Sequence, residues 1–302
     1  MGWFGYSLIS SLCWAGVQIV DKTLVDGEAP SPLHYLFVSG FSAIPVFVFL
    51  PLFFPVLALP SWQILVSVVA GILYFAANGL IFYAILRLDA SLAAAALAAV
   101  PASAAIGSWL FLGEGLEIVA AGSIGLITLG VVMMSIDSPD RAERGESLRT
   151  EWLMIAGAVV LLVLEYLLEA RVVRDATAPQ VFYWSRGGVI LATLLLGVFL
   201  REKALEALSW AFRRRRHVGL LTLGNEGLDM VAQASLIAAY ARGPVGLSTA
   251  VAYSNPALVF GGTVLINSIW RGAVPTEGDV AHHYWRMAGL VLVVAGIFLS
   301  IL

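Results

Sequence analysis

Long apolar runs separated by short polar connections occupy the chain from end to end. A helix needs about 20 apolar residues to cross the hydrocarbon core of a bilayer. On this measure the pattern predicts ten membrane-spanning helices, at residues 3–22, 32–54, 63–87, 90–112, 116–136, 152–172, 180–200, 217–241, 245–267 and 284–302. A transmembrane barrel would need shorter segments in which apolar and polar residues alternate. The predicted fold class is therefore an all-α integral membrane protein.

The longest charged stretch, DSPDRAERGESLRTE (137–151), lies between the fifth and sixth predicted helices. On either side of it, residues 84–102 align without gaps on residues 239–257, and the shift of 155 residues pairs Pro101 with Pro256. An odd number of helices in each copy inverts the second copy in the membrane, as in many secondary transporters. The sequence thus predicts two inverted five-helix repeats, 1–137 and 151–302, joined by a charged linker, 138–150.

Basic residues in the connections predict the orientation, because Lys and Arg are enriched in cytoplasmic loops. If the connections alternate sides, three basic residues fall on one side, Arg171, Arg174 and Arg242. Thirteen fall on the other, Lys22, Arg87, Arg141, Arg144, Arg149, Arg201, Lys203, Arg213, Arg214, Arg215, Arg216, Arg271 and Arg286. This asymmetry predicts a multi-pass protein of the bacterial inner membrane with both termini outside. The run FRRRRH (212–217) is interpreted as a topology anchor rather than a patch for anionic lipid or nucleic acid.

Composition agrees with a membrane protein and excludes several other classes. Hydrophobic residues make up 60% of the chain, charged residues only 12%, and the mean hydropathy is +0.91. The net charge of −3 gives no basic field for nucleic acid, and neither a phosphate-binding loop nor a dinucleotide motif is present. A single cysteine, Cys13, excludes an intrachain disulfide and a multi-cysteine metal site. We expect neither a cofactor nor a metal.

Two carboxylates three residues apart interrupt the eighth predicted helix. Glu226 and Asp229 lie near its middle, and a rotation of 100° per residue places Gln233 on the same face. Ionisable groups at this depth normally face a cavity or a partner and are functional candidates by default. Polar residues on three other predicted helices extend the candidate substrate site, namely Trp14, Gln18, Tyr74, Asn78 and Glu165.

Arg186 is the basic residue deep in a predicted helix, and Glu165, Glu226 and Asp229 are its candidate partners. One arginine cannot neutralise all three acids, so at least one should hold a proton or meet a cation from solution. Two hypotheses follow and can coexist. Either Glu226 or Asp229 exchanges a proton during transport, or the acids bind an ammonium group beside aromatic walls; the candidate walls are Trp14, Tyr74, Tyr166 and Tyr253.

Pro101 and Pro256 lie inside predicted helices and each removes a backbone hydrogen bond. They predict either flexible points for gating or static bends, and the sequence does not decide between these. The second site is the better candidate for substrate binding, because Tyr253 and Asn255 add polar groups there.

Several motifs follow one another in the same order in the two halves. The first copy shows Trp14, Lys22, Pro32, Arg87, Pro101 and Gly113-Glu114, and the second keeps Arg171, Pro179, Arg186, Arg242 and Pro256. This order resembles the EamA-type repeat of the drug/metabolite transporter superfamily. The second copy lacks the Gly-Glu pair, and Val100 and Asn255 stand before the prolines where the family often has an acid. The resemblance implies ten helices, a central cavity lined by the first, third, fourth, sixth, eighth and ninth, and gradient-driven transport.

The leading hypothesis is a secondary active transporter for a small organic metabolite, cationic or zwitterionic, such as an amino acid, amine or quaternary ammonium compound. The alternatives are a multidrug exporter of the same fold, an intramembrane enzyme and a lipid scramblase or passive channel. We do not expect the protein to be an enzyme, because neither a nucleophile nor a His-acid dyad accompanies the carboxylates. The expected partners are the small-molecule substrate and the bilayer, and the protein is expected as a monomer or homodimer.

Overall fold

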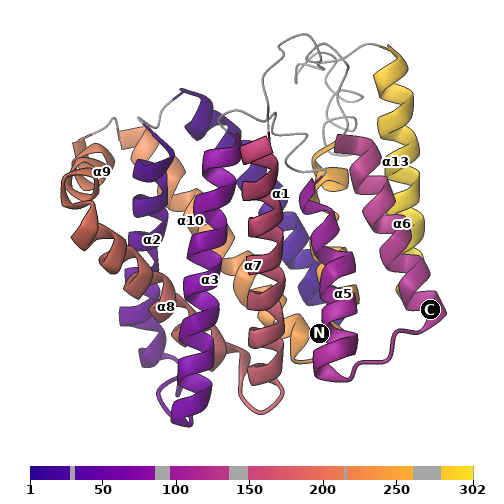
Figure 1. The fold of residues 1–302 in the computed structure, drawn as a ribbon, viewed down its shortest axis with the longest axis horizontal. Helices are drawn as coiled ribbons and strands as arrows, with labels where there is room; N and C mark the ends of the chain where they lie inside the picture. Colours follow the sequence, from indigo (N-terminus) through magenta and orange to yellow (C-terminus); the bar gives the residue numbers. More distant parts are fainter. Residues whose placement is uncertain (28–30, 86–95, 136–148, 214–215, 261–279, 302) are drawn as a thin grey trace.

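The computed structural model describes residues 1–27, 31–85, 96–135, 149–213, 216–260 and 280–301, and the regular structure in these ranges is helical throughout (Figure 1). The first half contains α1 (Trp3–Gly27), α2 (Pro32–Phe49), the short 3₁₀ helix η1 (Leu50–Leu52), α3 (Ser61–Ile85), α5 (Ala99–Leu112) and α6 (Ile118–Ser135). The second half contains α7 (Arg149–Val173), α8 (Ala178–Phe199), α9 (Arg201–Arg213), α10 (Arg216–Tyr240), α11 (Val245–Ala252) and α13 (Val280–Leu299).

Every predicted span overlaps one of these helices, and the all-helical class is confirmed. Four described stretches are long and apolar enough to cross a membrane on their own, Pro32–Leu52, Ser61–Ala84, Thr150–Val173 and Ala178–Phe199, and shorter apolar helices accompany them. Part of the predicted linker, 138–148, lies outside the described residues. So do several of the basic residues used for the orientation, Arg87, Arg141, Arg144, Arg214, Arg215 and Arg271.

The helix α9 is not one of the predicted spans. It has only 13 residues and many of them are polar, so its sequence does not contain the run of about 20 apolar residues that marks a membrane span. Its alanines explain its place in the fold: Ala204 and Ala207 are buried and pack with Phe37 of α2. This amphipathic helix therefore covers the outer side of α2 at one end of the molecule (Figure 1).

Two helices are interrupted shortly before a proline. The helical backbone breaks into a turn at Ala98, ahead of Pro101, and again at Tyr253 and Ser254, ahead of Pro256. In the second case helical structure resumes over residues 255–260. Each predicted continuous span is therefore two helical pieces in the described residues, and the 155-residue shift relates the two breaks.

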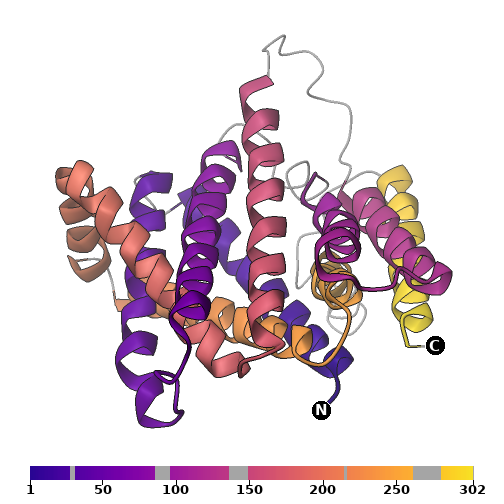
Figure 2. The same cartoon turned by 60° about the horizontal axis from the view of Figure 1, so that its bottom comes forward.

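The long helices stand side by side, with α9 at one end and the pair α6 and α13 at the other (Figures 1 and 2). Between these ends, α1 packs along α10, and α3 packs against both α7 and α8, whereas α2 touches α10 only briefly. The tightest crossing joins α3 to α8: a β carbon at Gly71 would lie 1.8 Å from the backbone oxygen of Ser185. The glycine is required there because no side chain fits between the two backbones.

Candidate functional site

Three helices converge on the carboxylate of Asp229, which lies in the middle of α10. Trp14 of α1 donates its indole N–H to Oδ1 at 3.0 Å, and Tyr74 of α3 donates its hydroxyl to Oδ2 at 2.7 Å. Arg186 of α8 places Nη1 3.9 Å from the same Oδ2. The sequence predicted all four residues as site residues, and the structure brings them together around one carboxylate. The Asp229 side chain keeps 16% of its surface exposed.

The local sequence of α8 explains how Arg186 reaches this position. Thr177 and Gln180 form a capping box at the start of the helix, where the backbone N–H of Thr177 donates to Gln180 Oε1 at 2.9 Å. Pro179 occupies the first turn, where a missing N–H has no cost. Further along α8, Gly188 lies against the backbone of Val68 in α3, where a side chain would not fit. This close approach places the guanidinium of Arg186 beside the Tyr74 ring, 4.8 Å from its centroid.

Arg186 is almost completely buried, with 3% of its surface exposed. Its guanidinium also lies 5.1 Å from the Phe182 ring centroid. Among the described residues, Nε and Nη2 have no hydrogen-bond partner. Three acids were predicted as partners of Arg186. The structure pairs it with Asp229, at the long distance of 3.9 Å between Nη1 and Oδ2.

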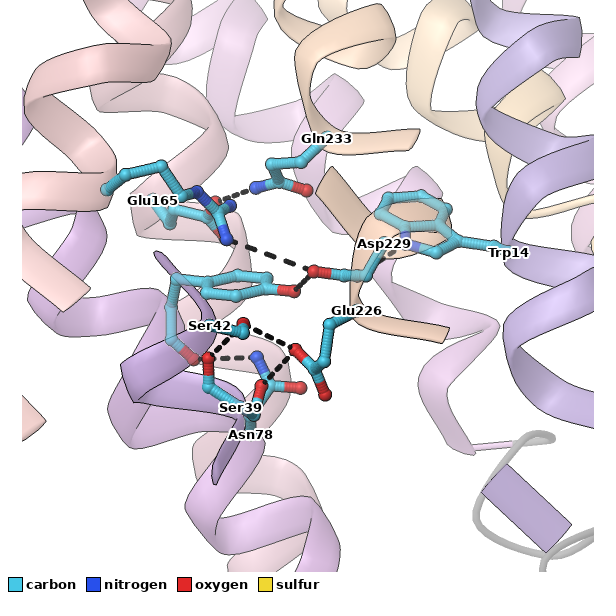
Figure 3. A network of polar contacts seen from close by, with 10 residues as sticks. Trp14, Ser39, Ser42, Asn78, Glu165, Glu226, Asp229 and Gln233 are labelled. Carbon is cyan, nitrogen blue, oxygen red and sulfur yellow. Dashed lines mark hydrogen bonds and ion pairs between the residues drawn. The ribbon is translucent and has the colours of Figure 1, made fainter. Parts of the chain in front are cut away.

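Glu226 points to a different helix from Asp229 (Figure 3). Its Oε2 accepts hydrogen bonds from Ser39 and Ser42 of α2, at 2.9 Å and 3.0 Å. Sequence reasoning missed both serines. Their spacing of three residues in an otherwise apolar helix is the signal that could have found them, because such residues share one face. The two carboxylates on α10 therefore belong to separate hydrogen-bond groups.

Glu165 of α7 accepts a short hydrogen bond from Gln233 Nε2, and both side chains are fully buried. This contact links α7 to α10 one turn beyond Asp229 (Figure 3). Asn78, also a predicted site residue, donates instead to the backbone oxygen of Tyr74 at 3.0 Å. Gln18 is exposed and makes no hydrogen bond among the described residues.

Aromatic rings extend from Asp229 toward the break in the α11 region. Trp14 and Tyr253 meet edge to face, with centroids 5.7 Å apart, and the hydroxyls of Tyr253 and Tyr166 lie 2.9 Å apart. Tyr253 itself forms the break, and the buried Asn255 follows it. Ser254 adds a contact with Ser11 of α1, at 3.1 Å between hydroxyl oxygens. Of the predicted aromatic walls, Trp14 and Tyr74 contact the carboxylate, and Tyr253 and Tyr166 continue the row beyond Trp14.

The arrangement around Asp229 is suited to binding a cation. A carboxylate held by an indole, a phenol and a guanidinium can exchange one of these donors for an ammonium group, and aromatic rings beside it favour a cation. Among the described residues, no group of three or more His, Cys, Asp and Glu side chains gathers to hold a metal ion.

The apolar helices are those of an integral, multi-pass membrane protein, and the polar side chains that they enclose are candidates for a functional site. The sequence model of the EamA-like transporter family, which belongs to the drug/metabolite transporter superfamily, matches residues 1–136 of this chain. The resemblance inferred from the motifs is thereby confirmed. Members of the family are transporters rather than enzymes.

A solved structure, a crystal structure of a protein, is similar in fold to the whole chain. The alignment covers 99% of this chain and 96% of that chain, with a TM-score of 0.66 and 17% sequence identity. At this identity the likeness concerns the fold alone. No curated protein matches the sequence.

Proposed function

We propose that the protein is a secondary active transporter for a small organic metabolite that carries an ammonium group, either a cation or a zwitterion. The observation that carries this proposal is the Asp229 carboxylate, partly exposed and bordered by the Trp14 indole and the Tyr74 phenol. A substrate ammonium would bind Asp229 by charge and the neighbouring rings by cation–π attraction. Tyr253 would form the wall on the side of the helix break.

The proposed mechanism is alternating access between two inverted five-helix repeats, 1–137 and 151–302, with both termini outside the bacterial inner membrane. Helix pairing supports the repeats. The contacts of α2 with α8, α5 with α11 and α6 with α13 each join two helices that belong to the same predicted span, the second, fourth or fifth, of the two halves. The third span of each half also packs on the first span of the other half. These contacts are α3 with α7 and α10 with α1, and both are extensive.

The two interrupted helices support the same mechanism. Breaks at corresponding positions of the two halves are typical of the helices that form a midplane site in transporters with inverted repeats. Pro101 and Pro256 would act as gating kinks, because each break loosens one helix at the level where the halves meet. Irregular backbone at this depth is tolerated only toward protein or a water-filled cavity.

Counterflow in proteoliposomes tests the substrate class. Purified protein would be reconstituted and offered labelled amines, amino acids, quaternary ammonium compounds and organic anions. We expect exchange of at least one ammonium compound. Replacing Asp229 by Asn should reduce that exchange by about 10- to 100-fold, because a hydrogen bond to a charged group contributes about 1.5–3 kcal/mol.

Glu117→Gln is the matched control, since it makes the same acid-to-amide change at an exposed residue away from Asp229. It should exchange like the parent. Exchange of an anion with none of the ammonium compounds would refute the cation site, as would full activity in Asp229→Asn. Efflux of many unrelated aromatic cations, in place of one class of metabolite, would support the multidrug exporter instead.

A further inference from the structure

Behind Asp229 lies a second group of buried polar side chains, between α7, α8 and α10. Its acids are Glu165 and Glu169, both on α7 and both completely buried. Arg186 interacts electrostatically with each of them as well as with Asp229. The cation site proposed above does not use Glu169, and its burial in an apolar helix therefore needs an explanation of its own.

Glu169 is the acid that hydrogen bonding leaves unsatisfied. Neither of its carboxylate oxygens accepts a well-formed hydrogen bond among the described residues, although the Ser185 hydroxyl lies beside it. Two nitrogens of Arg186, Nε and Nη2, also have no hydrogen-bond partner among the described residues. Buried polar groups are normally hydrogen-bonded, so unpaired donors and acceptors in one buried cluster need an explanation.

Asp229, Glu226 and Glu169 differ in their hydrogen-bond donors. Asp229 accepts from Trp14 and Tyr74, and Glu226 accepts from two serines, which stabilises both as carboxylates. A buried carboxylate without a well-formed hydrogen bond costs several kcal/mol, so Glu169 is expected to be neutral in this arrangement. The sequence assigned the coupling proton to Glu226 or Asp229, but the distribution of donors favours a group on α7.

In the described part of the chain, few other charged or titratable groups face Glu169. Those interacting with it are Glu165 on its own helix, Arg186 on α8 and Tyr240 on α10. From α3, which also packs on α7, the buried ionisable group is Tyr74, and α5 carries no ionisable side chain between Ala99 and Leu112. Arg186 is therefore the cation whose position would decide the charge of Glu169.

We propose that Glu169 is the proton-carrying site of the transporter, and that Arg186 couples it to Asp229 by pairing with one acid or the other. The proposal rests on the proposed function in one respect, that Asp229 binds the substrate ammonium. When the ammonium arrives, it replaces Arg186 at Asp229. Arg186 then pairs with Glu169, which releases its proton and becomes a carboxylate. One positive charge enters the site and one leaves, so the buried region keeps its net charge.

Glu165 provides a connection between the two acids. It interacts with both Glu169 and Asp229, and Gln233 holds it in place. A proton released from Glu169 would pass this side chain to reach Asp229, where the exposed surface of the site begins. Because Arg186 can pair with only one of the two acids at a time, the substrate at Asp229 and the proton on Glu169 would bind in alternation, which gives exchange.

Infrared spectroscopy tests the proton site without any substrate. Difference spectra of the full-length protein between acid and alkaline pH should contain the carbonyl band of a protonated carboxylic acid. The component of this band that comes from a buried acid should be lost in Glu169→Gln and retained, shifted, in Glu169→Asp, whereas Glu117→Gln should keep it. An unchanged band in Glu169→Gln would overturn the proposal whatever the substrate is.

A second experiment tests the coupling, with tetramethylammonium as the probe because it has no proton to donate. Tryptophan fluorescence, to which Trp14 in the site contributes, reports binding, and a pH indicator in weakly buffered detergent solution reports proton release. The parent and Glu169→Asp should release a proton for each cation bound, and Glu169→Gln should bind without release. Equal release from Glu169→Gln and the parent would refute the coupling while leaving the cation site intact. Binding that is equal in Asp229→Asn and the parent would instead refute the proposed function, and the infrared result would still decide on Glu169.

Discussion

Replacing Gly71 by Ala should break the contact that holds Arg186 in the site. A β carbon at this position would lie 1.8 Å from the backbone oxygen of Ser185 and 3.0 Å from the backbone nitrogen of Val189. Ordinary contact begins at 3.4 Å, so α3 and α8 must separate by the difference of 1.6 Å. No rotamer change relieves the clash, because the obstructing atoms are backbone.

The expected cost follows from this geometry. Overpacking typically costs about 1–3 kcal/mol, and we expect the upper end because a whole helix must move. A change of about 3 kcal/mol corresponds to a fall in Tm of roughly 6–12 °C in a protein of this size. The displacement also carries Arg186 away from Asp229, so exchange activity should fall together with stability.

Thermal unfolding in one detergent and at one scan rate measures the effect, with aggregation followed by size-exclusion chromatography. Gly125→Ala is the matched control, since a β carbon at Gly125 of α6 would meet nothing within 4 Å. The control should melt within about 2 °C of the parent, as surface substitutions usually change stability by less than 0.5 kcal/mol. If Gly71→Ala melted like Gly125→Ala, the close crossing of α3 and α8 would be refuted.

Two further substitutions test single contacts by the same measurement. Tyr74→Phe removes the 2.7 Å hydrogen bond to Asp229 and should lower stability by about 1.5–3 kcal/mol, the contribution of a hydrogen bond to a charged group. Tyr83→Phe, exposed on the same helix, should have no effect, and equal melting of the two would contradict the contact. Glu114→Gln weakens the ion pair with Arg174 at 2.8 Å and the hydrogen bond from Val245 N–H at 2.9 Å, so we expect a loss of about 1 kcal/mol against the neighbouring control Glu117→Gln. A Glu114→Gln protein as stable as that control would show that this link between α5, α7 and α11 contributes nothing.

Some of the site could be predicted from periodicity alone. Glu226, Asp229 and Gln233 stand out because charged and amide groups are costly in lipid, and helical spacing puts them on one stripe. The 155-residue shift pairs Tyr74 with Asp229, and the structure places these two side chains in contact. Which acid Arg186 approaches could not be predicted, because several candidates lay at similar depth.

The remaining contacts depend on how helices rotate about their axes, which a nearly uniform apolar pattern does not reveal. In α2 the apolar residues surround the helix, so nothing in the sequence shows that Ser39 and Ser42 face Glu226. The divergence of Glu226 and Asp229 has the same cause: two side chains three residues apart share a face of α10 but reach different neighbouring helices. The repeats, the substrate class and the orientation remain predictions.

In the proposed repeats, the position equivalent to Gly71 in the second half is Glu226. The backbone of α3 can therefore approach α8 without obstruction, whereas α10 carries a bulky, charged side chain where the same approach to α2 would be needed. If the transport cycle interchanges these two contacts, its two end states cannot have equal free energies. The unliganded protein would then rest mostly open to one side of the membrane, and substrate and proton would have to supply the work of turning it to the other.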